Sequence, residues 1–150
     1  MMDDAMIRKI REFNRSYTVW LEVLNREYLG TGFSWAQSRV LFEIYRCPGI
    51  NATELCAHLN MDKSYVSRIL LTLEKRGLLT RSLVPGTKGL KEIRLTEAGE
   101  KAAAQSDANG NRQIADKLKE VDEDDCVKLC EAMELIQNVL REHDEGGIRK

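Results

Sequence analysis

The hydrophobic period of the sequence changes at Gly77, and this change limits the folds that the chain can adopt. Before Gly77, apolar residues recur at steps of three and four, which predicts an amphipathic helix over about residues 62–76. After it, residues 78–84 and 90–95 alternate between apolar and polar side chains on either side of the turn-forming segment 85–89. This pattern predicts a two-stranded β-hairpin directly after a helix.

Two shorter helices are predicted upstream of this unit. Residues 35–45 carry apolar side chains at helical spacing, and residues 48–49, Pro-Gly, stop a helix because proline disfavours helical geometry in the residue before it. Asn51 or Thr53 can cap a short third helix. Asn60 then allows a tight turn into the central helix, for which Asp62 is a plausible N-cap. Three helices and a hairpin therefore follow one another between about residues 34 and 96.

Long helices are predicted at both ends of the chain. Gly30 and Gly32 are expected to end the first one, whose apolar stripe consists of Ile7, Ile10, Phe13, Tyr17, Trp20, Leu21, Leu24 and Tyr28. A helix of about 25 residues spans roughly 37 Å, which is longer than a compact domain of this size can cover. The economical solution is a two-fold dimer in which the ends of two copies pack together. A three-helix satellite within one chain is the alternative.

The C-terminal third predicts helix from Thr96 onward. Thr96 is a plausible N-cap, and Gly99 is an internal flaw in the first turn. We expect a break either at residues 109–111, Asn-Gly-Asn, or in the acidic block at residues 116–125. The last helix then has one apolar face, made of Cys126, Leu129, Cys130, Met133, Ile136 and Leu140.

The net charge of −1 hides an uneven distribution. Residues 62–94 contain eight Lys and Arg against three Asp and Glu, a local charge of +5, so the remaining residues carry −6. A basic face of this kind can bind phosphate while the acidic remainder keeps the protein soluble. No apolar run approaches the roughly 20 residues of a membrane span, and the N-terminus does not resemble a secretory signal. We therefore expect a cytoplasmic protein with no membrane partner.

The sequence predicts no catalytic residue, metal site or cofactor. No nucleophile–base or phosphate-cradling motif stands out, and His58 and His143 lie far apart. Cys126 and Cys130 share a helix face, where thiolates can bind zinc or meet a partner's thiols, but small buried apolar residues are the plainer interpretation. The same applies to the other two cysteines, Cys47 and Cys56. Reduced thiols fit a cytoplasmic chain better than disulfides do.

The helix pair and the hairpin together predict a mainly α fold with a small β-hairpin, a winged helix-turn-helix. Such a fold places a helix in the DNA major groove and a basic loop beside it on phosphates or in the minor groove. Hydrogen-bond donors line the central helix at Lys63, Ser64, Tyr65, Ser67 and Arg68. Cations of the hairpin are Arg81, Lys88, Lys91 and Arg94. Any one of these side chains alone is adequately explained as an ordinary solvated surface residue. Their order and spacing along the chain, taken together, favour a DNA-binding function.

The stretch FSWAQSRVLFEIYRCPGINATELCAHLNMDKSYVSRILLTLEKRGLLTRS, followed by IRLTEAGE, closely resembles the MarR family of bacterial transcriptional regulators. The resemblance covers about residues 6–142. The first helix, IREFNRSYT, is similar to the regulator half of MarR proteins fused to an acetyltransferase, although no acetyltransferase domain follows here. One departure concerns the wing. The family usually carries an acidic residue and arginines at its tip, where this chain has Thr87, Lys88 and Gly89.

The resemblance implies one MarR-like domain over residues 1–150. We expect residues from about 1 to 30 and from about 97 to 145 to form dimerisation helices. Residues from about 34 to 96 are expected to form the DNA-binding part. It implies a homodimer, with N- and C-terminal helices interlocked, that binds double-stranded DNA at a pseudo-palindromic operator. It also implies a small-molecule effector between the winged part and the dimer helices. We expect four aromatic residues to line this effector pocket: Tyr17, Trp20, Trp35 and Tyr45.

The predicted function is therefore a sequence-specific DNA-binding transcriptional regulator, a dimeric repressor released by an effector, and not an enzyme. By the resemblance, the five donors of the central helix are its base and phosphate contacts. A different class stays open: a protein-interaction module that kept the winged fold and lost DNA binding. A third alternative is a regulator half that serves an acetyltransferase in trans.

Overall fold

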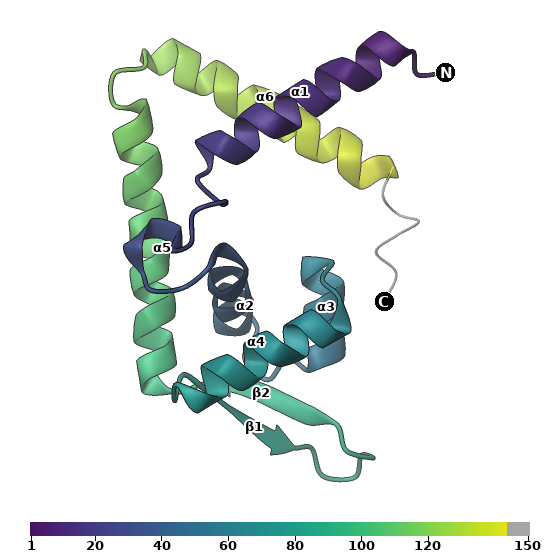
Figure 1. Ribbon diagram of the computed structural model, residues 1–150, viewed down its shortest axis with the longest axis vertical. Coiled ribbons are helices and arrows are strands. Elements are labelled where there is room, and N and C mark those ends of the chain that lie inside the picture. The colour runs from purple at the N-terminus through teal and green to yellow at the C-terminus, as the bar shows by residue number, and fades with distance from the viewer. Residues whose placement is uncertain (144–150) are drawn as a thin grey trace.

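The computed structural model describes residues 1–143 and is built of helices around one β-hairpin (Figure 1). Figure 1 shows three parts: a winged part below, the column of α5 beside it, and two crossing helices, α1 and α6, above. The elements in chain order are α1 (Asp4–Trp20), the 3-10 turn η1 (Tyr28–Gly30), α2 (Trp35–Arg46), α3 (Ala52–Leu59), α4 (Lys63–Lys75), β1 (Leu79–Leu83), β2 (Lys91–Leu95), α5 (Glu97–Leu118) and α6 (Glu123–His143).

The winged part contains the hydrophobic core. Helices α2, α3 and α4 pack together and against the hairpin, in which β1 and β2 pair antiparallel from Leu79↔Leu95 to Leu83↔Lys91. A bridge between Ile50 and Ile93 adds the α2–α3 turn to the sheet edge. The largest fully buried side chains all belong to this part: Val40, Leu41, Ile44, Leu55, Val66, Leu70, Leu73, Leu79 and Ile93. The predicted fold class, a winged helix-turn-helix, is confirmed.

Side-chain caps hold the ends of the helices in the winged part. Ser34 and Gln37 form a reciprocal capping box at the start of α2. Asn51, rather than Thr53, caps α3 by accepting from the Glu54 amide at 2.9 Å. Asn60 adopts a left-handed conformation with φ 49° in the turn that follows. Each of these ends satisfies backbone groups that a helix terminus leaves free.

Thr96 joins the wing to α5. Its hydroxyl donates to the Gly77 carbonyl at 2.6 Å and accepts from the Gly99 amide at 3.1 Å, which caps α5 as predicted. Gly99 is buried, and a Cβ there would overlap the carbonyl oxygen of Leu78 and lie 2.9 Å from its carbonyl carbon. The prediction that Gly99 is a flaw in the helix is therefore wrong, because α5 approaches this backbone so closely that only glycine fits.

Helix α1 is shorter than the sequence predicts. It ends at Trp20 instead of continuing to Tyr28, so Gly30 and Gly32 do not terminate it. The chain leaves the helix through Glu22, which has φ 60°. The apolar spacing that suggested a longer helix continues past this point but does not determine the backbone.

Polar contacts with α5 explain the early end of α1. The Gln113 side chain donates to the Leu21 carbonyl at 3.4 Å and to the Glu22 carboxylate at 2.8 Å. About one turn earlier in α5, the Asn109 amide donates to the Leu29 carbonyl at 3.2 Å. The segment between α1 and α2 is thus attached to α5, and tertiary hydrogen bonds override the local helical preference.

The break in the C-terminal helical region lies in the acidic block. Helix α5 continues through residues 109–111 and ends at Leu118, and α6 starts at Glu123. Of the two predicted break points, the second is therefore the correct one. The turn between them is stabilised by Asp122, whose carboxylate accepts from the Asp124 amide at 2.9 Å.

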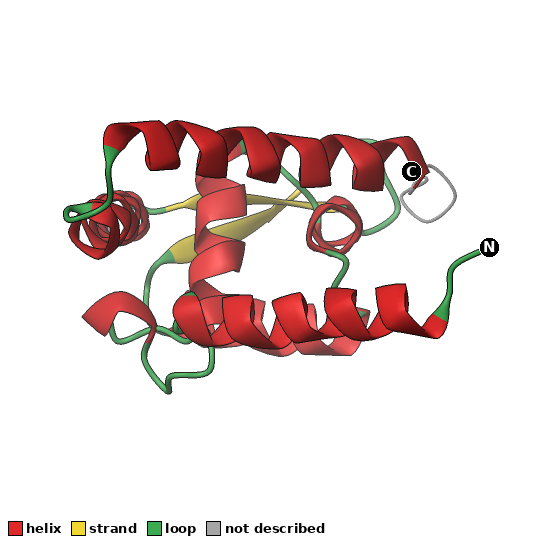
Figure 2. Ribbon diagram, turned by 90° about the horizontal axis from the view of Figure 1, so that it is seen from above, coloured by secondary structure: helices red, strands yellow, loops and turns green. Residues whose placement is uncertain are grey.

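Helices α1 and α6 lie apart from the core. They cross above the winged part in Figure 1, and Figure 2 shows them from above as two separate rods. Neither contains a fully buried side chain. None of the helices in residues 1–143 combines the length and apolar character that a bilayer crossing requires.

Candidate nucleic-acid interface

Helix α4 has one buried and one exposed face. Its buried side chains are Val66, Ile69, Leu70 and Leu73, and they hold the helix against the core. All five predicted donors are exposed: Lys63, Ser64, Tyr65, Ser67 and Arg68. The structure therefore brings these five side chains together on the first two turns of one helix, facing away from the core.

Local contacts order the start of α4. The Asp62 carboxylate accepts from the amides of Ser64 and Tyr65 at 3.1 and 3.3 Å, as its predicted capping role requires. The Arg68 guanidinium lies 5.8 Å from the centroid of the Tyr65 ring, within the range of a cation–π contact. Because both side chains are exposed, this contact restricts their rotamers without burying the donors of Arg68.

The hairpin extends from the end of α4 and projects a loop away from the core (Figure 1). Lys88 is exposed in this loop, and Lys91 is exposed at the start of β2, opposite Leu83. Neither lysine has an ion-pair partner among residues 1–143 at the distances of a salt bridge. Both cations are therefore available to an external anion.

Arg81 differs from these lysines because it is engaged inside the protein. Its guanidinium donates to both carboxylate oxygens of Glu74, at 3.1 and 2.9 Å, and only 24% of its side chain is exposed. The hydrogen bonds from Arg81 hold the pKa of the Glu74 carboxyl below its ordinary value, and those to Glu74 raise the pKa of Arg81. This bidentate pair braces β1 against α4.

Arg94 lies on β2 and has a weaker partner. Its Nε donates to the Glu92 carboxylate at 3.5 Å, and 56% of its side chain is exposed. The guanidinium also passes close to Gly49, where a Cβ would lie 3.0 Å from Nη2. Of the four predicted wing cations, two have no ion-pair partner among residues 1–143 and two have carboxylate neighbours, which lie on α4 for Arg81 and on β2 itself for Arg94.

A hollow of about 240 Å³ joins the helix and the wing. Three predicted cations, Lys63, Arg81 and Lys91, line it from α4, β1 and β2. The first residues of α3, Asn51 to Thr53, form its other wall. The N-terminus of α3 and the cations Lys63 and Lys91 give this hollow a positive potential that suits a phosphate group, whereas the charge of Arg81 is balanced by Glu74.

The four aromatic residues predicted as an effector pocket do not meet in one cavity. Tyr17 and Trp20 stack at 5.7 Å and line an apolar hollow of about 280 Å³ between α1 and α6. Trp35 lines a separate hollow of about 150 Å³ together with residues of α5. Tyr45 is exposed and lines neither of these hollows.

The four cysteines are free thiols in different environments. Cys47 and Cys56 are half-buried and pack against the core, and burial raises the pKa of the Cys56 thiol. Cys126 is half-buried, and Cys130 is exposed on α6 within a single chain. The interpretation of the cysteines as core residues therefore fits Cys47 and Cys56 better than it fits Cys126 and Cys130.

Comparison with known proteins agrees with this geometry. A family model described as the MarR family matches residues 31–88, which include α2, α3, α4 and β1. Residues 31–88 of this chain belong to the MarR family. The MarR resemblance stated from the sequence is thereby confirmed.

Proteins similar to this chain include a transcriptional regulator and a protein solved in complex with DNA. An HTH-type transcriptional regulator of Bacillus subtilis, YdgJ, is 25% identical over 108 residues, which are 72% of this chain and 66% of the relative. A MarR family regulator from Listeria monocytogenes, solved with a 26mer DNA, is 21% identical with a TM-score of 0.70, covering 100% of this chain and 99% of that one.

A further solved structure with this fold is that of BpsR from Bordetella bronchiseptica, which describes how 6-hydroxynicotinic acid regulates DNA binding by BpsR. It is 14% identical with a TM-score of 0.70 and covers 87% of this chain and 98% of that one. Identities this low establish the shared fold and no more.

Proposed function

We propose that this protein is a DNA-binding transcriptional regulator that contacts duplex DNA with α4 and the wing. The observation that carries the proposal is the exposed face of α4, where five hydrogen-bond donors stand on two turns next to a cationic hollow. The family, and the DNA complex of a protein with this fold, support the same function. The cytoplasmic location predicted from the sequence stays part of this proposal.

In this proposal, α4 enters the major groove and the wing contacts the backbone beside it. Ser64 and Ser67 are small enough to let the helix backbone approach the bases, and Arg68 can form a bidentate contact with guanine or phosphate. Lys88 and Lys91 neutralise phosphates or reach the minor groove. Lysine lacks the planar fork of arginine, so the wing contributes affinity more than sequence discrimination.

We assign different roles to Arg81 and Arg94. Arg81 holds β1 against α4 through Glu74 and contributes its charge to the hollow without leaving the pair. Arg94 is exposed and can exchange its weak contact with Glu92 for a phosphate. We therefore retain Arg94 as a backbone contact and assign Arg81 to the positioning of the wing.

The proposal includes a homodimer formed through α1 and α6. Each helix exposes an apolar face, and the two enclose an apolar groove of about 500 Å³ whose walls include Ile10, Phe13, Ile136 and Leu140. Exposed apolar faces of this size are costly in water and mark interaction surfaces. A two-fold dimer covers them and sets two α4 helices to read a pseudo-palindromic operator. The predicted end of the dimerisation region, residue 145, lies outside the described residues.

Repression and release by a small-molecule effector complete the proposal. The hollow beside Tyr17 and Trp20 lies between α1 and α6, where a ligand would couple to the dimer geometry. Its lining is apolar and aromatic, which suits an aromatic ligand. BpsR, with the same fold, shows that 6-hydroxynicotinic acid regulates DNA binding in that protein.

A protein-interaction module is the second candidate. It is favoured by the wing, where two of four cations have carboxylate partners and the tip carries no arginine. Selection of binding sites from random double-stranded DNA separates the two candidates. A DNA-binding dimer enriches sequences with two related half-sites about one helical turn apart. Failure to enrich any sequence at low salt would favour the interaction module.

A further inference from the structure

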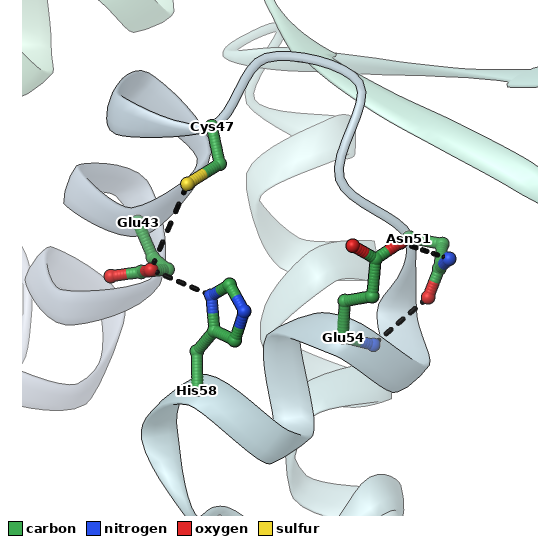
Figure 3. Close-up of polar contacts among 5 residues, drawn as sticks. All are labelled: Glu43, Cys47, Asn51, Glu54 and His58. Carbon is green, nitrogen blue, oxygen red and sulfur yellow. Dashed lines mark hydrogen bonds and ion pairs between the residues drawn. The ribbon is translucent and has the colours of Figure 1, made fainter. Parts of the chain in front are cut away.

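Three side chains that the DNA-binding proposal leaves unused form one cluster between α2 and α3. Glu43 and Cys47 stand one turn apart at the end of α2, and His58 reaches them from the last turn of α3 (Figure 3). His58 Nδ1 lies 2.9 Å from Glu43 Oε1, and Cys47 Sγ lies 4.0 Å from the same oxygen. One donor atom from each of the three residues lies within 4.8 Å of the others.

The carboxylate at the centre of this cluster is buried without a permanent cation. Only 9% of the Glu43 side chain is exposed, and among residues 1–143 its one ion-pair partner is His58, which is charged only when protonated. A buried carboxylate costs substantial desolvation energy unless a charge or several hydrogen bonds compensate it. His58 and Cys47 contribute one contact each to this carboxylate, and neither side chain carries a permanent positive charge.

We propose that Glu43, Cys47 and His58 bind a thiophilic divalent cation, Zn²⁺ in the first instance. The donors are a carboxylate oxygen, a thiolate sulfur and an imidazole nitrogen, the set that zinc accepts and that Mg²⁺ and Ca²⁺ do not favour. Tetrahedral bonds of about 2.0–2.3 Å place donors roughly 3.3–3.7 Å apart. The observed separations of 2.9 and 4.0 Å lie on either side of this spacing, and all three donor atoms lie within 4.8 Å of one another, so the side chains must rotate to close around an ion.

The surroundings fix the geometry of the site and leave a way in. Asn51 and Glu54 cap the start of α3 through reciprocal contacts, so Glu54 is occupied and the helix that carries His58 is anchored without metal (Figure 3). His58 exposes 43% of its side chain, which opens the cluster to solvent. Three protein donors leave a fourth tetrahedral position for water or an external ligand.

The cation would connect α2 and α3, and α3 immediately precedes α4, the helix that we propose to contact DNA. Only Asn60, Met61 and Asp62 separate α3 from α4, so a metal that fixes α3 on α2 also limits the movement of α4. Metal binding is a property of these three residues and holds whether or not the chain binds DNA. It therefore extends the proposed function without depending on it.

Cobalt is the direct probe because a Co²⁺–thiolate bond gives a near-ultraviolet charge-transfer band and tetrahedral coordination gives visible bands. The reduced, chelator-treated full-length protein is titrated with Co²⁺ and then with Zn²⁺ as competitor. We expect one Co²⁺ per chain and displacement of both bands by Zn²⁺. Cys47→Ser should remove the thiolate band, and His58→Gln should weaken binding by roughly 100-fold or more, since even outer-shell changes cost about 10–100-fold.

Matched controls distinguish this site from other thiols. Cys56→Ser on α3 and Cys130→Ser on α6 should leave stoichiometry and spectrum unchanged. Because His58 is exposed, His58→Gln keeps the fold, which circular dichroism of the metal-free proteins verifies. Absence of a thiolate band in the reduced wild-type protein would overturn the proposal. So would a band that survives in Cys47→Ser and disappears in Cys130→Ser.

Discussion

Gly99→Ala tests how closely α5 docks on the winged part. In the structure, an added Cβ would overlap the Leu78 carbonyl oxygen and would lie 3.2 Å from the Cβ of Leu95. The Leu78 oxygen already accepts the Thr96 amide at 3.0 Å, so it cannot move away without losing that bond. Relief therefore requires that the first turn of α5 shift away from the wing.

The expected loss follows from two opposing effects. Alanine in a helix interior is favoured over glycine by about 1 kcal/mol. Overpacking of a well-packed site costs about 1–3 kcal/mol, and the rigid backbone partner places this site at the upper end. A strained or lost Thr96–Leu78 hydrogen bond adds about 1 kcal/mol. We expect a net loss near 2–3 kcal/mol, which for a chain of this size lowers Tm by roughly 4–12 °C.

Gly110→Ala is the matched control because it lies in the same helix with space around it. The nearest atom to its Cβ would be Leu29 Cδ1 at 3.8 Å, an ordinary contact. This variant should gain about 1 kcal/mol and raise Tm by roughly 2–4 °C. Both are measured by thermal and urea unfolding at one protein concentration, since dimerisation makes Tm concentration-dependent. A Gly99→Ala protein at least as stable as Gly110→Ala would refute the close approach.

Three further predictions concern the interface and its brace. Arg68→Ala should weaken specific DNA binding by about 1–3 kcal/mol and relax base preference in a gel shift, whereas Lys128→Ala on α6 should bind like wild type. Lys88→Ala should reduce affinity evenly across sequences and lower the salt slope by about 1; an effect confined to one base pair would exclude a phosphate contact. The pKa of Glu74 is lowered in the folded state by Arg81, so its stabilising contribution is complete above the ordinary glutamate pKa and is lost as pH falls through the lowered value. Glu74→Gln should therefore show a shallower loss of unfolding free energy on acidification than wild type, and identical acid titrations would contradict the brace.

The winged part could be predicted from the sequence because its signals are local. The change of period at Gly77 and the caps at Asn51, Asp62 and Thr96 act over three or four residues, and the structure confirms each of them. The exposed side of α4 followed from the same helical spacing.

Features set by distant residues could not be predicted in this way. Helix α1 ends early because Gln113 bonds the Leu21 carbonyl, which is 92 positions away in sequence. Gly99 is explained by a backbone that only the folded wing places next to it. Apolar periodicity contains no information on either contact.

The candidate site shows the same limit. In the sequence, Arg81 has no sign of a partner, and only the folded hairpin places it next to Glu74. Likewise, His58 meets Glu43 only because α3 packs against α2. The spacing of Glu43 and Cys47, four positions apart on one helix, was a signal for a paired ligand set. It pointed to no third partner, because His58 lies 15 positions from Glu43.

The most direct test of the central claim is the salt dependence of binding to the duplex obtained by selection. Fluorescence anisotropy is measured with wild type, Arg68→Ala and Lys128→Ala on the selected duplex and on a scrambled duplex of equal length. We expect the logarithm of the association constant to fall linearly with the logarithm of the salt concentration, with a slope of about −0.9 per neutralised phosphate. We also expect wild type and Lys128→Ala to prefer the selected duplex over the scrambled one. Arg68→Ala should lose that preference. A flat salt dependence, or equal affinity of wild type for both duplexes, would contradict a DNA-reading role for α4.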